Sequence, residues 1–389
     1  MKKLIWTIVV IAIIIVCIVA AVFGFKGSST APSTSTTKNQ EPSTYKIGVI
    51  APLTGDAAVY GEPAVKIYQI AVDEINAAGG INGKNIELVV QDGKCNGEGA
   101  VNAAQQLVNV VGVKAIIGGF CSGESLAAIP VAEAKNVALI SPSSSSPDLT
   151  GKSKIFFRDF PSDSSQGAII AQVAYDKGFR KIAFLQEQTD YSVGIYKAFS
   201  EKFQQLGGTV VKEEFPTAEK DFRSQLTKLK AGNPNAIFVD SQTPAASEKI
   251  FQQMKDLGWK TTVLLNDVAI GNADLVPKYK DILEGAIGAE FGVDPSNPKF
   301  KHLIDTYKTK FNAEPPYQSY AQTEYDAVYL IKDAIASVGY DGAKIAAWGH
   351  QVKDWQGASG LITIESNGDL VGGHRPEMVK NGKVVPYVK

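Results

Sequence analysis

Short apolar runs rich in β-branched residues alternate with amphipathic stretches from Tyr45 onward, and this alternation limits the fold more than any other feature of the chain. The runs that we expect to form strands are 45–51, 86–91, 115–118, 137–141, 181–186, 209–214, 236–240, 263–266 and 285–291. Helical periodicity is clear at 65–78, 100–111, 167–177, 196–206 and 246–257. Strands separated by helices of this length pair in parallel through right-handed crossovers. The sequence therefore predicts an α/β protein.

The alternation of strands and helices is too long for a single sheet of ordinary size. It begins again near Asp163, after the break Phe160-Pro161-Ser162. We therefore expect two doubly wound lobes. The first lobe is predicted at 45–162 and the second at 163–290.

The remaining segment, 291–389, has a different pattern. It opens with a break at 294–298, rich in Pro, Ser and Asn, and continues with a long helical stretch at 317–338. Asn381-Gly382 is a strong signal for the two-residue turn of a β-hairpin.

The first 25 residues predict a membrane anchor or a signal segment. Two lysines precede an uncharged apolar run at 4–25, which is long enough to span a bilayer and longer than a usual signal core. Lipid attachment at Cys17 and signal cleavage are the alternatives, and all three place the body outside the cytoplasm. The segment 26–44 is rich in Ser, Thr and Pro and predicts a flexible linker. We expect the body at the extracytoplasmic face of the cell envelope.

Charge and motifs argue against several function classes. The net charge is -1, and no run of Lys and Arg forms a basic patch for nucleic acid. The sequence contains no phosphate-binding loop and no nucleophile elbow. Its three histidines are isolated and are expected to be structural or exposed: His302, His350 and His374. We therefore expect no enzyme activity, no cofactor and no metal site.

Polar residues follow the predicted strands, where ligands bind in open α/β sheets. Lobe 1 supplies hydroxyls and amides near glycines, which suit a carboxylate, and lobe 2 supplies carboxylates and an aromatic ring, which suit an ammonium. Together they predict a site for a zwitterion between the lobes. The candidate ligand-binding residues are Tyr60, Ser122, Ser143, Ser145, Tyr191, Gln242 and Asp267.

These residues also have plainer interpretations. Ser122 can cap a helix beginning near Gly123, and the run 143–146 can be a solvated loop. Asp267 can be a turn or N-cap residue, and the two tyrosines can be packing residues. Their common position at strand ends favours the binding site. Cys95 and Cys121, the cysteines of the body, predict a disulfide outside the cytoplasm, with two free buried thiols as the alternative.

Several motifs, in order, resemble the type I periplasmic binding proteins of the leucine/isoleucine/valine-binding group. The first is KIGVIAPLTG at 46–55 with Tyr60-Gly61, and the second is AGGING at 78–83 with Gln91-Asp92. The others are IGGFCS at 117–122, ISP at 140–142 and DSSQG at 163–167. The resemblance covers essentially 45–389.

The resemblance implies a two-lobed fold whose chain crosses between the lobes three times, so that two doubly wound parallel-sheet lobes are joined by a three-strand hinge. It implies that 291–365 returns to lobe 1 and that 366–389 forms the last hinge strand and returns to lobe 2. Members of the group bind branched-chain and related amino acids, amides or small acids and deliver them to permeases.

Position by position, the resemblance also implies roles for single residues. Ser122 and Ser145 match residues that bind the ligand carboxylate, and Ser143 sits where a backbone carbonyl meets the ammonium. Asp267 falls where leucine-binding members have a glutamate for that ammonium. Tyr60 and Tyr191 match aromatic residues lining the cleft, and Cys95 and Cys121 match the disulfide pair of the group.

The chain departs from the group at three places. Gly123-Glu124 replaces a stretch that is usually rich in Ser and Thr, Gln242 replaces an aromatic residue, and Asp267 is one methylene shorter than Glu. These changes favour a more polar amino acid or an amide as well as an aliphatic one.

We expect a monomeric amino-acid-binding protein that works with the permease and ATPase subunits of an ABC transporter. A ligand-sensing receptor ectodomain, or a binding protein for an amide or small carboxylate, is the alternative.

Overall fold

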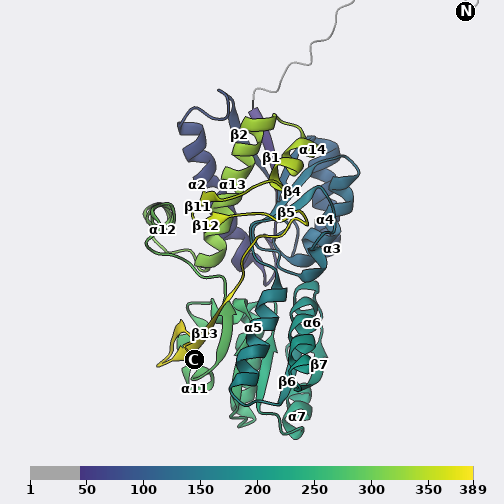
Figure 1. Cartoon of the computed structure of the whole chain (residues 1–389), viewed down its shortest axis with the longest axis vertical. Helices are drawn as coiled ribbons and strands as arrows, with labels where there is room; N and C mark the ends of the chain where they lie inside the picture. The colour runs from purple at the N-terminus through teal and green to yellow at the C-terminus, as the bar shows by residue number, and fades with distance from the viewer. Residues whose placement is uncertain (1–43, 389) are drawn as a thin grey trace, which may run out of the picture. The chain divides into compact units, whose positions relative to one another are not determined.

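In the computed structural model, which describes residues 44–388, the alternation of apolar runs and helices builds two α/β lobes (Figure 1). The sheet of lobe 1 has the order β2-β1-β3-β4-β5 and is parallel throughout. Its strands are β1 (Thr44–Ala51), β2 (Asn85–Asp92), β3 (Ala115–Ile117), β4 (Ala138–Ser141) and β5 (Phe156–Arg158). All residues of β3, β4 and β5 are buried, as expected for short apolar strands with helices on both faces.

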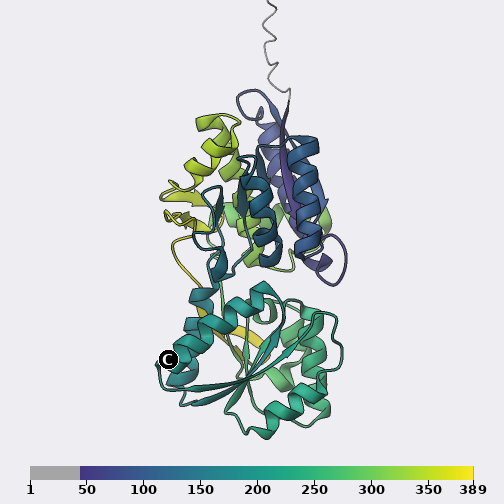
Figure 2. The same ribbon diagram turned by 90° about the vertical axis from the view of Figure 1, so that its right-hand side faces the viewer.

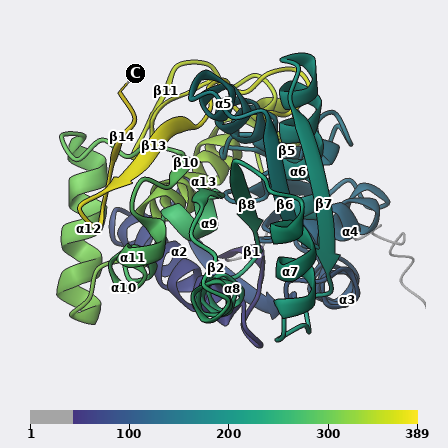
Figure 3. The same ribbon diagram turned by 90° about the horizontal axis from the view of Figure 1, so that it is seen from below.

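The sheet of lobe 2 has the order β14-β13-β10-β9-β8-β6-β7 (Figure 3). Its parallel strands are β6 (Lys181–Glu187), β7 (Thr209–Phe215), β8 (Ala236–Asp240), β9 (Thr262–Leu265) and β10 (Ile287–Glu290). The hairpin β13 (Arg375–Lys380) and β14 (Lys383–Pro386) joins beside β10 in the antiparallel direction. Asn381 and Gly382 form its turn with positive φ, which confirms the predicted hairpin.

Helices cover the faces of both sheets. Lobe 1 carries α2 (Ala58–Ala77), α3 (Gly97–Gln105), its π-helical continuation η1 (Gln106–Val111), α4 (Ser122–Glu133), the 3-10 turn η2 (Pro147–Leu149), α12 (Pro298–Phe311), α13 (Gln318–Val338) and α14 (Gly342–Gly349). Lobe 2 carries α5 (Asp163–Asp176), α6 (Asp190–Gln205), α7 (Arg223–Ala231), α8 (Pro244–Asp256), α9 (Asp267–Ile270), α10 (Leu275–Lys278) and α11 (Lys280–Leu283). Figure 2 shows that the purple-to-blue beginning of the body and the green-to-yellow segment with α13 and α14 share one lobe.

The nine predicted strands are confirmed, with ends that shift by one or two residues. The sequence did not predict β5, nor the small hairpin β11 (Trp355–Gly357) and β12 (Gly360–Ile362) that packs beside α13. The predicted anchor or signal segment at 1–25 and the linker at 26–44 lie outside the described residues, apart from Thr44. Within residues 44–388, no helix combines the length and the apolar character that crossing a membrane requires.

The chain passes between the two lobes three times: after β5, after β10 and before β13. One aromatic side chain touches the other two crossing segments. The ring of Phe160, on the first crossing, lies 5.6 Å from the ring of Phe291 on the second and 6.0 Å from that of His374 on the third. The three segments are therefore packed together at one place.

Candidate functional site

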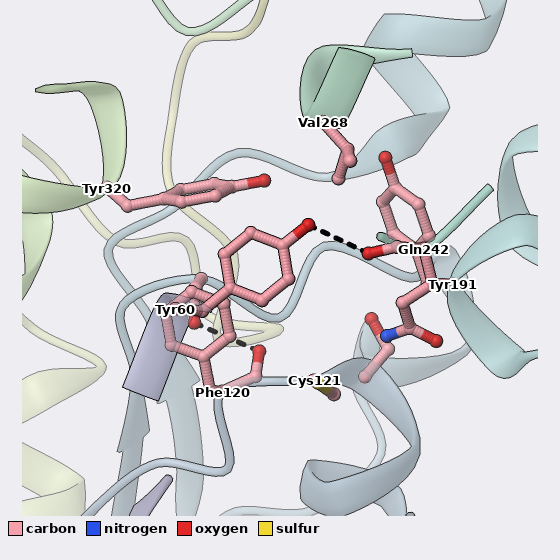
Figure 4. A pocket seen from close by; sticks show the side chains of 9 residues that line it. Tyr60, Phe120, Cys121, Tyr191, Gln242, Val268 and Tyr320 are labelled. Atoms are coloured by element: carbon pink, nitrogen blue, oxygen red, sulfur yellow. Dashed lines mark hydrogen bonds between the residues drawn. The ribbon is translucent and has the colours of Figure 1, made fainter. Parts of the chain in front are cut away.

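A pocket with an empty volume of about 290 Å³ lies between the lobes, beyond the carboxyl ends of several strands (Figure 4). Both lobes contribute, and the return segment adds one residue from α13. The residues that line it are Tyr60, Phe120, Cys121, Ser122, Ser143, Tyr191, Gln242, Val268 and Tyr320. In Figure 4, Tyr60, Phe120 and Tyr320 stand opposite Tyr191 and Gln242.

The lobe 1 wall is the beginning of α4. Ser122 is the first helical residue, and Cys121 is the N-cap, so Ser122 does not cap the helix. Its Oγ accepts a hydrogen bond from the Ser146 amide at 3.1 Å, which leaves its own O–H proton to donate. The N–H groups of a first helical turn have no acceptor within the helix, and the helix dipole favours an anion there. This wall can therefore bind a carboxylate.

Two contacts hold that wall in place. Cys95 and Cys121 form a disulfide, as predicted. The Glu124 carboxylate accepts hydrogen bonds from the Cys95 amide at 2.8 Å and from the Cys121 amide at 2.9 Å. Burial raises the pKa of Glu124 to about 7, although these amide hydrogen bonds act to lower it.

The lobe 2 wall is organised by Asp267, which is 1% exposed and is the first residue of α9. Tyr191 donates its hydroxyl proton to Oδ1, and Tyr320 donates to Oδ2 at 2.7 Å. Asn266, not Asp267, caps the short helix by accepting from the Ala269 amide. Burial and the charge of Asp267 raise the pKa of both tyrosine hydroxyls, so both remain protonated donors.

The two walls are also linked directly. Tyr60 of lobe 1 donates its hydroxyl proton to the backbone carbonyl of Gln242 in lobe 2 at 2.8 Å. The backbone N–H of Gln242 donates to Glu187 Oε2 at 2.7 Å. At the exposed edge, Lys220 Nζ lies 3.0 Å from Asp56 Oδ2. The lobes therefore meet around the pocket.

The structure brings five of the seven predicted ligand-binding residues to the pocket wall: Tyr60, Ser122, Ser143, Tyr191 and Gln242. Ser143 uses its hydroxyl to donate to the Phe120 carbonyl at 2.9 Å. Asp267 lies behind Tyr191 and Tyr320. Ser145 is buried away from the pocket wall, and its carbonyl accepts from the Asp163 amide at 2.8 Å.

Four wall residues were not among the ligand-binding candidates: Phe120, Cys121, Val268 and Tyr320. Cys121 was predicted only as a disulfide partner. Phe120 and Val268 are direct neighbours of predicted residues. Tyr320 belongs to α13, whose long helical pattern carried no strand-end signal. Its position one turn after the Pro315-Pro316 break is the feature of the sequence that could have marked it.

The histidines lie away from the pocket wall. His374 is 4% exposed, its Nδ1 is 2.8 Å from Ser165 Oγ, and burial lowers its pKa to about 4. His302 is exposed and pairs with Glu74 at 2.8 Å. Within residues 44–388, no group of three or more His, Cys, Asp or Glu side chains is arranged to hold a metal ion.

A two-lobed α/β fold with a pocket between the lobes is the architecture of extracytoplasmic solute-binding proteins. A profile of the periplasmic binding protein family matches residues 44–377. The chain belongs to this family.

Individual relatives come from several bacteria. The leucine-binding protein LivK of Thermotoga maritima has a solved structure that is 32% identical, with a TM-score of 0.79, and the match covers 89% of this chain and 98% of that one. The structure of LivJ of Streptococcus pneumoniae in complex with isoleucine is 29% identical, with a TM-score of 0.77, and covers 88% and 100%. The leucine-, isoleucine-, valine-, threonine- and alanine-binding protein of Pseudomonas aeruginosa is 28% identical over 84% of this chain and 87% of its own.

Proposed function

We propose that the chain is an extracytoplasmic amino-acid-binding protein that passes its ligand to the permease of an ABC transporter powered by separate ATPase subunits. The observation that carries the proposal is the opposed polarity of the two pocket walls. Hydrogen-bond donors at the start of α4 face the ligand from lobe 1, and the Asp267 carboxylate with its two tyrosines lies on the lobe 2 side. This arrangement matches the carboxylate and the ammonium of a zwitterion.

The relatives support the amino-acid class. They bind leucine, isoleucine, valine, threonine and alanine according to their names. We place Tyr60, Ser122, Ser143, Ser145, Tyr191, Gln242 and Asp267 in the binding machinery. Ser145 takes part by holding Asp163, the first residue of α5, through its carbonyl. The family consists of binding proteins, and we assign no catalytic step to the chain.

The lobes close by bending at the three crossings. We assign 45–162 and 291–365 to lobe 1, 163–290 to lobe 2, and 366–389 to the last hinge strand and the hairpin of lobe 2. The segment 1–25 anchors the monomer at the outer face of the plasma membrane, and 26–44 is the linker. Ligand favours the closed state only to the extent that it binds that state better than the open one.

Calorimetric titration of the full chain tests the proposal. Leucine, isoleucine, valine, threonine, alanine and glutamine are each compared with two leucine analogues. One analogue, 4-methylpentanoate, lacks the ammonium, and the other, isoamylamine, lacks the carboxylate. We expect at least one amino acid to bind and both analogues of the leucine skeleton to bind at least tenfold more weakly than leucine.

Matched serine variants locate the site. Ser122→Ala is expected to weaken binding by roughly 10-fold, the loss of one hydrogen bond to a charged group. Ser366→Ala, at an exposed position, is expected to bind as the native chain does. Equal binding of leucine and of both analogues would overturn the zwitterion site, and no binding by any of the six amino acids would overturn the ligand class.

A further inference from the structure

A second pocket adjoins the interlobe pocket and is built by lobe 1 alone. It has an empty volume of about 200 Å³, part of which is open to solvent. Tyr60, Phe120 and Tyr320 line both pockets, and Figure 4 shows these three rings along one side of the interlobe pocket. The Tyr60 ring lies 5.2 Å from the Phe120 ring and 6.2 Å from the Tyr320 ring. These three rings therefore form the boundary that the two pockets share.

The walls of the second pocket are apolar except for one acid and the tyrosines Tyr60, Tyr317 and Tyr320, whose hydroxyls already have hydrogen-bond partners. Val59, Pro63 and Ile67 line it from α2, and Pro315 and Pro316 line it from the segment before α13. Glu324 of α13, which is 3% exposed, adds a carboxyl group to this apolar lining.

Glu324 has no polar partner within residues 44–388: its carboxyl accepts no hydrogen bond and joins no ion pair. Asp326 on the same helix shows the contrast, because it accepts from the Ala358 amide at 2.7 Å and the Ser359 amide at 2.8 Å. Burial raises the pKa of Glu324 well above its usual range. An unpartnered acid in an apolar pocket costs free energy, and a ligand that supplies the missing donor removes that cost.

We propose that the second pocket is a binding compartment for an apolar chain that ends in an N–H donor, and that Glu324 is the acceptor. The donor is an ammonium, an amide or a guanidinium. It belongs either to the side chain of the amino acid in the interlobe pocket or to a separate small amine. In the first case the inference rests on the proposed function and adds a specificity determinant to it.

Matched ligand pairs test this assignment by calorimetry on the full chain at pH 7.5. Lysine is compared with norleucine, and glutamine with norvaline, because each pair has a similar aliphatic chain with and without a terminal N–H donor. We expect the donor-bearing member of at least one pair to bind at least tenfold more tightly. Pentylamine, which has no carboxylate, reports binding of a separate amine.

Two variants of Glu324 identify the acceptor. Glu324→Met fills the space without an acceptor and should abolish the preference in both pairs. Glu324→Gln keeps an acceptor without a charge, so it should lose the lysine preference and retain any glutamine preference. Both variants should unfold at the same temperature as the native chain or higher, because they remove an unpartnered acid. Asp305→Asn, an exposed acid on α12, is the matched control and should leave the preference intact.

Ser122→Ala separates this inference from the proposed function. If that variant binds every ligand roughly tenfold more weakly, the donor belongs to the amino-acid side chain. If pentylamine binding is unchanged there and is lost in Glu324→Met, the donor belongs to a separate amine. Equal binding within both pairs together with no pentylamine binding overturns the inference. So does a preference that is unchanged in Glu324→Met. Leucine binding that is weakened in Ser122→Ala sustains the proposed function in either case.

Discussion

At the scale of single residues, the pocket depends on acidic side chains that are held by defined donors. The Asp267 carboxylate accepts hydrogen bonds from the hydroxyls of Tyr191 and Tyr320, and the Glu124 carboxylate accepts from the backbone amides of Cys95 and Cys121. Both carboxylates are buried, so their hydrogen bonds carry more energy than they would at the surface. Each therefore leads to a measurable prediction.

Asp267→Asn should weaken amino-acid binding by roughly 10- to 100-fold, because a charged acceptor for the ligand ammonium is replaced by a neutral amide. Titration calorimetry measures the change. Asp274→Asn, an exposed position seven residues further on, should bind as the native chain does. Equal losses in the two variants would show that charge in this region, rather than the Asp267 contact, governs binding.

Glu124 should make the free energy of unfolding depend on pH. Its folded-state pKa of about 7 lies above the ordinary value of 4.5, so the folded chain takes up this proton more readily than the unfolded chain. The stabilisation is complete below about pH 4.5 and is lost as the pH rises through about 7, to a total of about 3 kcal/mol.

Urea denaturation between pH 4.5 and 8 measures this effect. Glu124→Gln should remove most of the decline in the free energy of unfolding that Glu124 causes as the pH rises. Glu201→Gln, at an exposed acid on α6, should leave that decline unchanged. If the free energy of unfolding of Glu124→Gln falls with rising pH as steeply as that of the native chain, Glu124 does not titrate in this range.

At the scale of elements, most strands could be predicted from the sequence, because a strand buried on both faces needs a continuous apolar run. β5 could not, because its apolar run is only Phe156-Phe157 and it ends in Arg158. That arginine is fully buried and reaches Asp369, more than two hundred positions away, with its Nε 2.8 Å from Oδ1. Its burial is decided by a tertiary contact that no local pattern contains.

The disulfide belongs to this scale because it joins the segment before α3 to the start of α4. Replacing both cysteines by serine should lower the free energy of unfolding by about 3 kcal/mol, since the bond closes a loop with a sequence separation of 26. Urea denaturation with and without reductant measures the change. Reductant should destabilise the native chain by a similar amount and should not affect the double variant. A native chain that reductant leaves unchanged would contradict a stabilising role.

At the scale of the whole molecule, the expectation that pocket residues follow the ends of strands located residues from both lobes. It did not locate the pocket residue that the return segment supplies. Tyr60, Ser122 and Tyr191 follow strands of their own lobes. Tyr320 reaches Asp267 only because the chain comes back to lobe 1 after β10. The burial of Ser145 against Asp163 and the second pocket around Glu324 likewise result from packing between segments, which the sequence pattern does not describe.

Closure of the lobes should be separable from the ligand contacts at Gly194 on α6. A Cβ at this position would lie 2.6 Å from Pro147 Cδ and 3.1 Å from Ser146 Oγ of the opposite lobe. Gly194→Ala should therefore disfavour the closed state and weaken ligand binding by roughly 10-fold, as expected when the binding-competent population falls by that factor. The helix itself gains from alanine, so thermal stability should not fall.

Calorimetry and small-angle X-ray scattering of the ligand-saturated chain measure affinity and closure together. Val193→Ala is the matched control, because it also raises helix propensity but alters a side chain that is 42% exposed. A Gly194→Ala chain with native affinity would mean that ligand binds without the contact between α6 and η2. Weaker binding with an unchanged melting temperature would instead show that the approach of the two lobes, which a single hydrogen atom at Gly194 permits, contributes to affinity beyond the contacts in the pocket.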